Sequence, residues 1–282
     1  MIFTYRSTLV DRQGGHAKNI ATAIDTDKWI EWLKADKLGL YGNTAEVVEK
    51  HLLPALCTEN YDELSLAVNH YDQEWYKVNQ TVIFEFAMFV WAGFKAGKYS
   101  ADTWATVFSH AWQSGSRGMM AGVKLSQAQV IEFFRAAPMH RMHRAVAFEG
   151  EDLNAEYAAL PDEFQVQRGV STGIDHFEDG FSWTRHPQEA LNFAAINCHN
   201  KNEIPGIIYA IIPKTAVLAL FSYEGEVVVD PSVKKVAVER DFFKGKVLKE
   251  FRSNFDAEAN SNDVLFNTGY NESRKAKNIF ER

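Results

Sequence analysis

Cysteine is scarce in this chain, which has two among its 282 residues, Cys57 and Cys198. Two cysteines cannot build a disulfide framework or a four-cysteine zinc site, so the sequence excludes a disulfide-rich scaffold and a protein held together by such a zinc site. The scarcity also favours a reducing compartment, and we expect a cytoplasmic protein.

Long hydrophobic runs and excess positive charge are also missing. The most apolar stretch, 82–94, is interrupted by Glu85 and is shorter than the roughly 20 residues that a membrane-spanning helix needs. The N-terminus has no charged leader followed by an apolar run and a cleavage site, so we expect no secretory signal. The formal net charge of −7 opposes bulk attraction to nucleic acid or to an anionic membrane. We therefore expect no membrane partner.

The first half of the chain has apolar residues at helical spacing from about residue 25 to 154. Ser126 precedes an apolar run and Gln129 follows it by three positions, which predicts a capping box at a helix start. The segment 115–118 contains two glycines but lacks the ending of a phosphate loop, so it predicts a connection between helices. Aromatic residues between 71 and 94 are most simply core, and a partner groove is the minority interpretation.

A metal site is not expected in this half. His140 and His143 are three positions apart, the spacing of one helix face, but no third ligand follows at a matching spacing. We therefore predict no metal.

The second half changes to short β-branched runs bounded by turn residues. The runs are 165–170, 207–212, 216–221, 227–229 and 236–238. One helix lies among them, with Pro187 in its first turn and four residues predicted to face inward: Ala190, Phe193, Ala194 and Ile196. This order predicts an α+β chain with a helical domain over 1–155, a sheet domain over 156–255 and a polar tail over 256–282.

Two strands of the sheet domain carry polar residues that suit a ligand. Arg168 ends an alternating strand, where its guanidinium fork can hold a pyrophosphate, and Gly169 lets another group approach the backbone closely. Ser182 and Thr184 place two hydroxyls on the same face of another strand, because side chains alternate with period two. Taken alone, these residues are more simply explained as a surface or salt-bridging arginine and a Ser-x-Thr that is commonplace in any sheet.

Glu224 and Glu226 form the most informative pair of the sheet domain. If the chain is extended there, the two carboxylates point the same way, which costs energy unless a ligand or a catalytic task offsets it. Glu226 leads directly into Val227–Val229, which would hold its carboxylate rigidly. The alternative is a hairpin turn with solvated carboxylates.

In this order, the Arg, Ser-x-Thr and Glu-x-Glu segments resemble the motifs of the ADP-ribosyltransferase superfamily, in particular its bacterial or phage toxin-like members. The resemblance covers residues 160–240. It implies a split β-sandwich over 156–255, NAD as the substrate and no metal. Arg168 and Ser182 are closer together than in the well-known toxins of the family, which affects how NAD would be enclosed.

The resemblance also implies a role for each site residue. Glu226 would stabilise the oxocarbenium ion that forms when nicotinamide leaves. Glu224 would orient or deprotonate the nucleophile, and Ser182 would hydrogen-bond Glu226 and position it. Arg168, with Gly169 and Thr184 in the cofactor site, would bind NAD.

The acceptor of ADP-ribose stays open at this point. The resemblance implies a protein arginine, which often accompanies a Glu-x-Glu pair in the family, whereas a basic run with interleaved aromatics favours nucleic acid. That run contains Lys234, Lys235, Arg240, Lys244, Lys246, Lys249, Arg252, Phe242, Phe243 and Phe251. Toxin-like members imply a host-modifying effector whose helical half recognises a target or a neutralising antitoxin. The alternatives are an NAD glycohydrolase and a non-catalytic module that binds a nucleotide or a partner.

Overall fold

A computed structural model describes residues 4–5, 20–21, 50, 52–56, 60–76, 82–122, 125–172, 179–198 and 202–251. The chain divides into two compact units, Met1–Ala155 and Glu156–Arg282. Helices and an antiparallel sheet are both present, which confirms the α+β class. The predicted tail, 256–282, lies outside the described residues, and so do Cys57 and Arg252.

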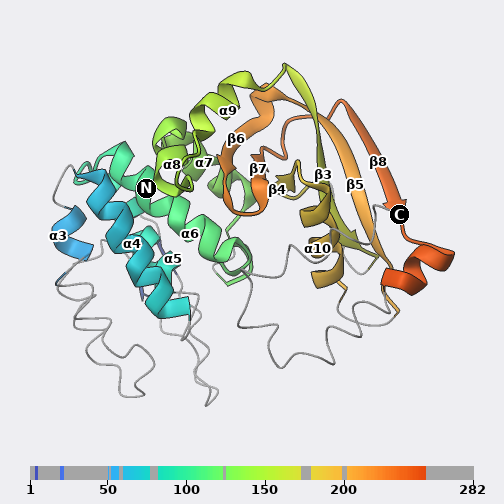
Figure 1. The fold of residues 1–282 in the computed structure, drawn as a ribbon. Coiled ribbons are helices and arrows are strands. Elements are labelled where there is room, and N and C mark those ends of the chain that lie inside the picture. Colours follow the sequence, from blue (N-terminus) through green and yellow to red (C-terminus); the bar gives the residue numbers. More distant parts are fainter. Residues whose placement is uncertain are drawn as a thin grey trace, which may run out of the picture. The chain divides into compact units, whose positions relative to one another are not determined.

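The first unit is built mainly of helices (Figure 1). They are α3 (Leu53–Leu56), α4 (Tyr61–Tyr76), α5 (Val82–Lys95), α6 (Ala101–Gly122), α7 (Gln127–Ala136) and α8 (Met139–Val146). Helix α9 (Leu153–Ala159) crosses the boundary between the units. Two short strands, β1 (Thr4–Tyr5) and β2 (Ile20–Ala21), pair with each other in antiparallel fashion.

The core of the first unit is a cluster of aromatic rings around Trp104 of α6. Trp104 is fully buried, its ring centroid lies 4.8 Å from that of Trp91 and 4.7 Å from that of Phe108, and its Nε1 donates a hydrogen bond to the Phe133 carbonyl. The Trp91 contact is tilted and the Phe108 contact is stacked, and such contacts add to the stabilisation from the area that aromatics bury. Trp91 belongs to the segment predicted as core, and the structure confirms that prediction for it.

Helix α7 begins as the sequence predicts, but α6 does not end as predicted. The Ser126 hydroxyl accepts a hydrogen bond from the Gln129 amide, and the Gln129 side chain accepts one from the Ser126 amide, which confirms the capping box. The connection predicted over 115–118 is wrong, because this segment lies inside α6. Each interior glycine costs about 1 kcal/mol relative to alanine, which the packing of Trp104 and Trp112 in the same helix can offset.

Acid is expected to destabilise the first unit through His110. Burial lowers the pKa of this imidazole to about 4 from 6.5. Ser65 donates its only hydroxyl proton to the Ala145 carbonyl, so the neutral His110 ring donates from Nε2 to the Ser65 oxygen. Well above pH 6.5 the imidazole is neutral in the folded and unfolded chain alike, and it contributes no pH dependence.

Below pH 6.5 the unfolded chain takes up this proton first, so the free energy of unfolding falls until about pH 4. The total loss from the 2.5-unit difference is about 3 kcal/mol. The measurement is a series of urea unfolding curves between pH 7 and pH 4 for the chain and for His110→Gln. The variant should show a shallower pH dependence, and an equal slope would contradict the assignment to His110.

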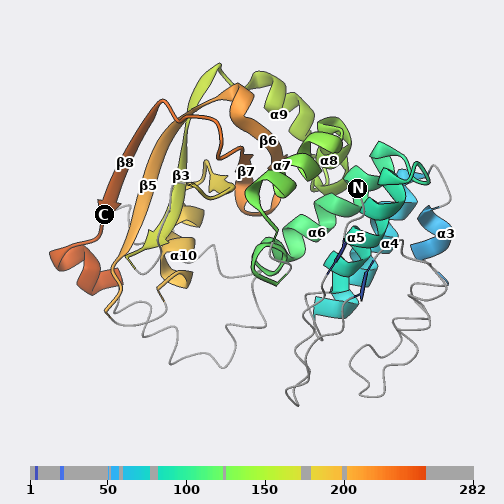
Figure 2. The ribbon, with the colours of Figure 1, turned by 180° about the vertical axis from the view of Figure 1, so that it is seen from behind.

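The second unit is a six-stranded antiparallel sheet with the strand order β6-β7-β4-β3-β5-β8. The strands are β3 (Glu163–Ser171), β4 (Ser182–Thr184), β5 (Pro205–Pro213), β6 (Val217–Phe221), β7 (Glu226–Val229) and β8 (Ala237–Phe242). All the predicted β-branched runs fall on strands or at their starts. Figure 2 shows β8 at the edge of the sheet beside β5.

The pairing is uneven across the sheet. Strands β3 and β5 pair along their whole lengths, from Glu163 opposite Pro213 to Ser171 opposite Pro205. Among the described residues, β3 and β4 share one register pair, Gln167 with Thr184. The sheet therefore consists of two three-stranded halves, β6-β7-β4 and β3-β5-β8, joined by limited pairing.

Helix α10 (Pro187–Ile196) lies against β3 and β5 (Figure 1). Ala190 and Ala194 are fully buried and Phe193 is half-buried, as expected. The prediction for Ile196 is wrong, because its side chain is 51% exposed. Ala190 and Ala194 define the inward face of α10. Ile196 follows Ala194 by two positions, so it is rotated about 200° from Ala194 around the helix axis and points outward.

Candidate functional site

The hairpin between β6 and β7 carries the two glutamates in different backbone environments. Glu224 has φ 63° and ψ 7°, and Gly225 has φ 54°, within the single 3₁₀ turn Tyr223–Gly225. The prediction of an extended chain is therefore wrong at Glu224. The chain has to reverse its direction within residues 222–225 to form the hairpin, and Gly225 readily adopts the left-handed backbone that this turn requires. Glu226 is the first residue of β7 and pairs with Phe221.

Thr184 ties this hairpin to the neighbouring strand β4. Its hydroxyl donates to the Glu224 carbonyl at 2.9 Å and to the Gly225 carbonyl at 3.3 Å, and it accepts from the His186 amide at 3.0 Å. The side chain is 4% exposed, so water does not compete for these bonds. A single buried hydroxyl thus fixes the left-handed turn and the start of α10 together.

Replacing Thr184 by valine is expected to destabilise the second unit by about 1–3 kcal/mol, because the Glu224 and Gly225 carbonyls and the His186 amide lose a buried partner. Valine keeps the shape of threonine but has no hydroxyl. The measurement is urea unfolding of Thr184→Val beside Thr184→Ser, which keeps the hydroxyl and should remain close to the parent. Equal stability of the valine variant would show that the three bonds do not hold the turn.

Strand register brings Glu226 next to Thr184. These two residues are direct cross-strand partners, whereas Ser182 lies opposite Val228. Ser182 and Thr184 share one face of β4, so Ser182 is a diagonal neighbour of Glu226. Behind Glu226, Val227–Val229 are fully buried, so the strand that carries this carboxylate is fixed in the core.

Arg168 reaches the start of β4 rather than the glutamates. It follows Gln167, the partner of Thr184, so it leaves β3 on the side opposite to Thr184 and Glu226. Its Nη1 donates to the Ser182 carbonyl at 2.6 Å. The structure therefore brings Ser182, Thr184 and Glu226 together on one face, and it places Arg168 against the backbone of the same short strand.

Gly169 is in contact with α10. A β-carbon built on it would lie 2.0 Å from the Ala190 carbonyl oxygen and 2.2 Å from the Ala194 amide nitrogen. The group that approaches this glycine is thus the helix backbone. Asn197 donates a further hydrogen bond to the Gly169 carbonyl and joins the end of the helix to β3.

His186 is a member of the site that the sequence reasoning missed. Its side chain is exposed and lies against the hairpin, where a β-carbon on Gly225 would be 1.9 Å from Cδ2 and 2.3 Å from Nε2 of the ring. An imidazole beside the turn that carries Glu224 can donate or accept a hydrogen bond with a substrate. Its position two residues after Thr184 and directly before Pro187 was the available signal.

The described part of the basic run lies in the connection before β8, on β8 itself and in the residues that follow it. Arg240 is exposed on the edge strand β8, and Lys246 forms an ion pair with Glu250 four positions later. The rings of Phe243 and Phe251 pack on each other edge-on at 5.2 Å. This arrangement resembles a solvated face over a small core more than a row of stacking platforms.

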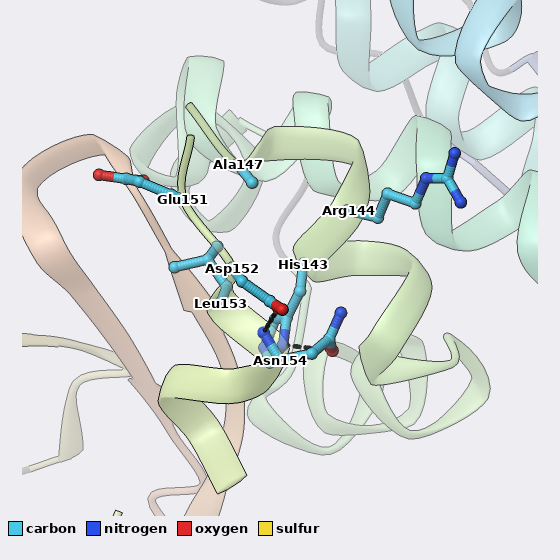
Figure 3. Close-up of a pocket in the computed structure, with 7 residues that line it drawn as sticks. All are labelled: His143, Arg144, Ala147, Glu151, Asp152, Leu153 and Asn154. Atoms are coloured by element: carbon cyan, nitrogen blue, oxygen red, sulfur yellow. Dashed lines mark hydrogen bonds between the residues drawn. The ribbon is translucent and has the colours of Figure 1, made fainter. Parts of the chain in front are cut away.

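A cavity of about 420 Å³ in the first unit is lined by His143, Arg144, Ala147, Glu151, Asp152, Leu153 and Asn154 (Figure 3). The His143 Nδ1 atom lies 3.0 Å from the Asn154 side-chain oxygen, and the Asn154 amide group donates to the His140 carbonyl. Burial lowers the pKa of His143, which favours the neutral ring. Arg144 points away from these groups toward its partner Asp62. These bonds join α8 to the start of α9, so we assign the cluster a structural role.

In the part of the chain that the structure describes, no three His, Cys, Asp or Glu side chains gather as metal ligands would. The helices within those ranges are all too short or too polar to span a bilayer. Comparisons of the chain with protein-family models, with curated proteins and with solved structures give no match.

Proposed function

We propose that the second unit is a mono-ADP-ribosyltransferase that cleaves NAD and transfers ADP-ribose to a macromolecular acceptor. The observation that carries the proposal is the position of β7, β4 and β3 as three consecutive strands of one sheet. Strand β7 begins at Glu226 of the Glu-x-Glu segment, β4 carries the Ser-x-Thr segment and β3 carries Arg168. The resemblance requires the three segments to meet, and their meeting supports it.

The limited pairing between β3 and β4 is also consistent with the proposal. A sheet that divides into two three-stranded halves suits a split β-sandwich, in which a ligand would lie where the halves separate. An extended dinucleotide has its pyrophosphate and its nicotinamide ribose at separate places. Arg168 leaves β3 on the side opposite to Glu226, so one NAD molecule contacts both residues only if it passes between the halves where β3 and β4 separate.

The chemistry follows from the position of each group. When the bond between nicotinamide and ribose breaks, positive charge develops on the ribose, and the Glu226 carboxylate stabilises that charge. Thr184 and Ser182 orient the strand face that carries Glu226, and Arg168 holds the phosphates, which lowers the entropic cost of reaching the transition state. Glu224, held in the turn by Thr184, activates the incoming nucleophile.

The acceptor favoured by the Glu-x-Glu segment is a protein arginine. The case for nucleic acid is weaker, because the rings of Phe243 and Phe251 pack on each other instead of forming separate platforms on which bases could stack. We propose a toxin or host-modifying effector that acts in a cytoplasm, with the helical unit binding the target or a neutralising partner.

The experiment is incubation of the purified chain with NAD labelled in its adenylate part, alone and with a cell extract. Nicotinamide, protein-bound label and nucleic-acid-bound label are then counted separately. Label on protein supports the proposal, label on nucleic acid changes the acceptor, and free ADP-ribose alone indicates an NAD glycohydrolase. If NAD is not consumed in either condition, the proposal fails in favour of a binding module.

A further inference from the structure

We propose that the side chain of Gln167 binds the carboxamide of the nicotinamide group and thereby selects this group among pyridine compounds. The inference rests on the proposed function, because nicotinamide is the leaving group of NAD. It assigns a ligand to a buried polar residue of β3 other than Arg168.

The first observation is a row of side chains that crosses the sheet on the face that carries Glu226. Each member is the direct cross-strand partner of the next, in the order Glu226, Thr184, Gln167, Tyr209 and Glu239, on β7, β4, β3, β5 and β8 (Figure 1). Direct partners in an antiparallel sheet point to the same face. Gln167 is two strands from Glu226, roughly 10 Å by the usual strand spacing. A nucleoside can span this distance, with its ribose at Glu226 and its base at Gln167.

The second observation is that the Gln167 amide is buried without a hydrogen-bond partner. The residue is 8% exposed, and its side chain forms no hydrogen bond to any of the residues that the structure describes. The neighbouring Thr184 already donates its only hydroxyl proton to the carbonyls of the turn before β7. A buried amide that stays unpaired costs free energy, and a ligand with a donor and an acceptor removes that cost.

The Gln167 amide is also within reach of a ligand. Within the described ranges, the unpaired side-chain atoms that the fold seals from solvent lie elsewhere, on Trp91, Gln113 and Arg185. On either side of Gln167 in the row, Tyr209 is half-buried and Glu226 is half-buried. The row is therefore open along its length, and a planar group can lie on it beside the amide.

The third observation is that the charges of the row suit the nicotinamide end of NAD. The row contains two glutamates and no lysine or arginine, so it disfavours phosphate. Burial raises the pKa of Tyr209, and Asp241 and Glu239 raise it further, so the phenol stays neutral. The nicotinamide ring is positively charged while it is bonded to ribose. Carboxylates and the face of a tyrosine ring both attract such a ring.

A carboxamide is complementary to the Gln167 side chain. The glutamine amide has an acceptor oxygen and an NH₂ group that donates. The carboxamide of nicotinamide has the same two groups, so the two amides can form a pair of hydrogen bonds in opposite directions. A ketone at the same ring position has an acceptor but no donor, and it can form only one of the two bonds.

The test is NMR titration of the full chain with 1-methylnicotinamide, which keeps the charged ring of NAD and has no ADP-ribose to lose. Gln167→Met is expected to weaken its binding about 10-fold, because the carboxamide loses its partner. ADP-ribose lacks the nicotinamide and should bind both proteins equally. Gln165→Met is the matched control and should bind as the parent does, because Gln165 lies two positions earlier on the same face of β3 and is exposed.

Two further measurements do not depend on the affinity of the variant. Methionine has a similar length and no amide, so Gln167→Met should unfold at the urea midpoint of the parent or above it. A lower midpoint would show that the fold itself satisfies the amide, and would overturn the inference. In the parent, 1-methyl-3-acetylpyridinium should bind about 10-fold more weakly than 1-methylnicotinamide, since a methyl group replaces the amide nitrogen. Equal affinities of the parent for the two compounds would overturn the inference as well.

The outcomes separate this inference from the proposed function. Weaker binding of 1-methylnicotinamide by Gln167→Met but not by Gln165→Met supports it, even if the parent consumes no NAD, in which case only the proposed activity fails. Unchanged affinity in Gln167→Met overturns it, even if the parent consumes NAD. A parent that does not bind 1-methylnicotinamide overturns it too. Equal losses in both methionine variants, or a loss of ADP-ribose affinity in Gln167→Met, would indicate a general effect on the sheet and would also overturn it.

Discussion

Replacing Glu226 by glutamine is expected to lower the rate of NAD cleavage strongly while leaving NAD affinity close to that of the parent. Glutamine keeps the size of the side chain but removes the negative charge that would stabilise the oxocarbenium ion. Electrostatic groups of this kind contribute about 10²–10³ in kcat. The buried valines that follow Glu226 should keep the strand in place, so the loss will not come from unfolding. The measurement is nicotinamide release at saturating NAD.

Two further variants make the Glu226 result specific. Glu239→Gln removes an exposed carboxylate from the edge strand β8 and should cleave NAD at the parent rate. Glu224→Gln should still release nicotinamide but should transfer little ADP-ribose to an acceptor, because Glu224 acts on the nucleophile. Normal nicotinamide release by Glu226→Gln would remove Glu226 from the catalytic role.

Replacing Gly169 by alanine is expected to destabilise the second unit by about 3 kcal/mol, the upper part of the usual range for overpacking. The new methyl group would lie 2.0 Å from the Ala190 carbonyl and 2.2 Å from the Ala194 amide. Both are backbone atoms of α10, so relief requires the helix to move away from β3. The measurements are urea unfolding and hydrogen exchange of the β3 amides.

Gly180→Ala is the contrasting variant, because its methyl group would meet the end of the flexible Arg168 side chain. We expect little change in its unfolding free energy and weaker binding of ADP-ribose. The opposite result for Gly169→Ala would be informative: parental stability with lost NAD binding would make Gly169 a cofactor contact, as the sequence suggested, rather than a packing position.

The strands of the second unit were predictable because β-branched runs bounded by turn residues are local signals. The same holds for the capping box of α7, which depends on Ser126 and Gln129 alone. Ile196 was mispredicted although its signal was local, because apolarity was given more weight than its angle around the helix. The glycines in α6 were mispredicted because the packing that offsets their cost lies elsewhere in the helix.

The candidate site was predictable as a set of residues but not as a geometry. No local pattern states that Thr184 lies opposite Glu226 and Ser182 opposite Val228, because register depends on how separate strands pair. The approach of α10 to Gly169 joins segments distant in the sequence. The left-handed backbone of Glu224 could not be predicted from the sequence either, since few residues other than glycine adopt this conformation.

The backbone of Glu224 implies a conflict between durability and activity. A left-handed residue other than glycine costs roughly 1–2 kcal/mol, and glycine or asparagine would occupy the same position at lower cost. Selection for heat resistance alone would therefore tend to discard this glutamate. A lineage or a laboratory screen that keeps Glu224 therefore retains a less stable hairpin together with a carboxylate in the turn before β7.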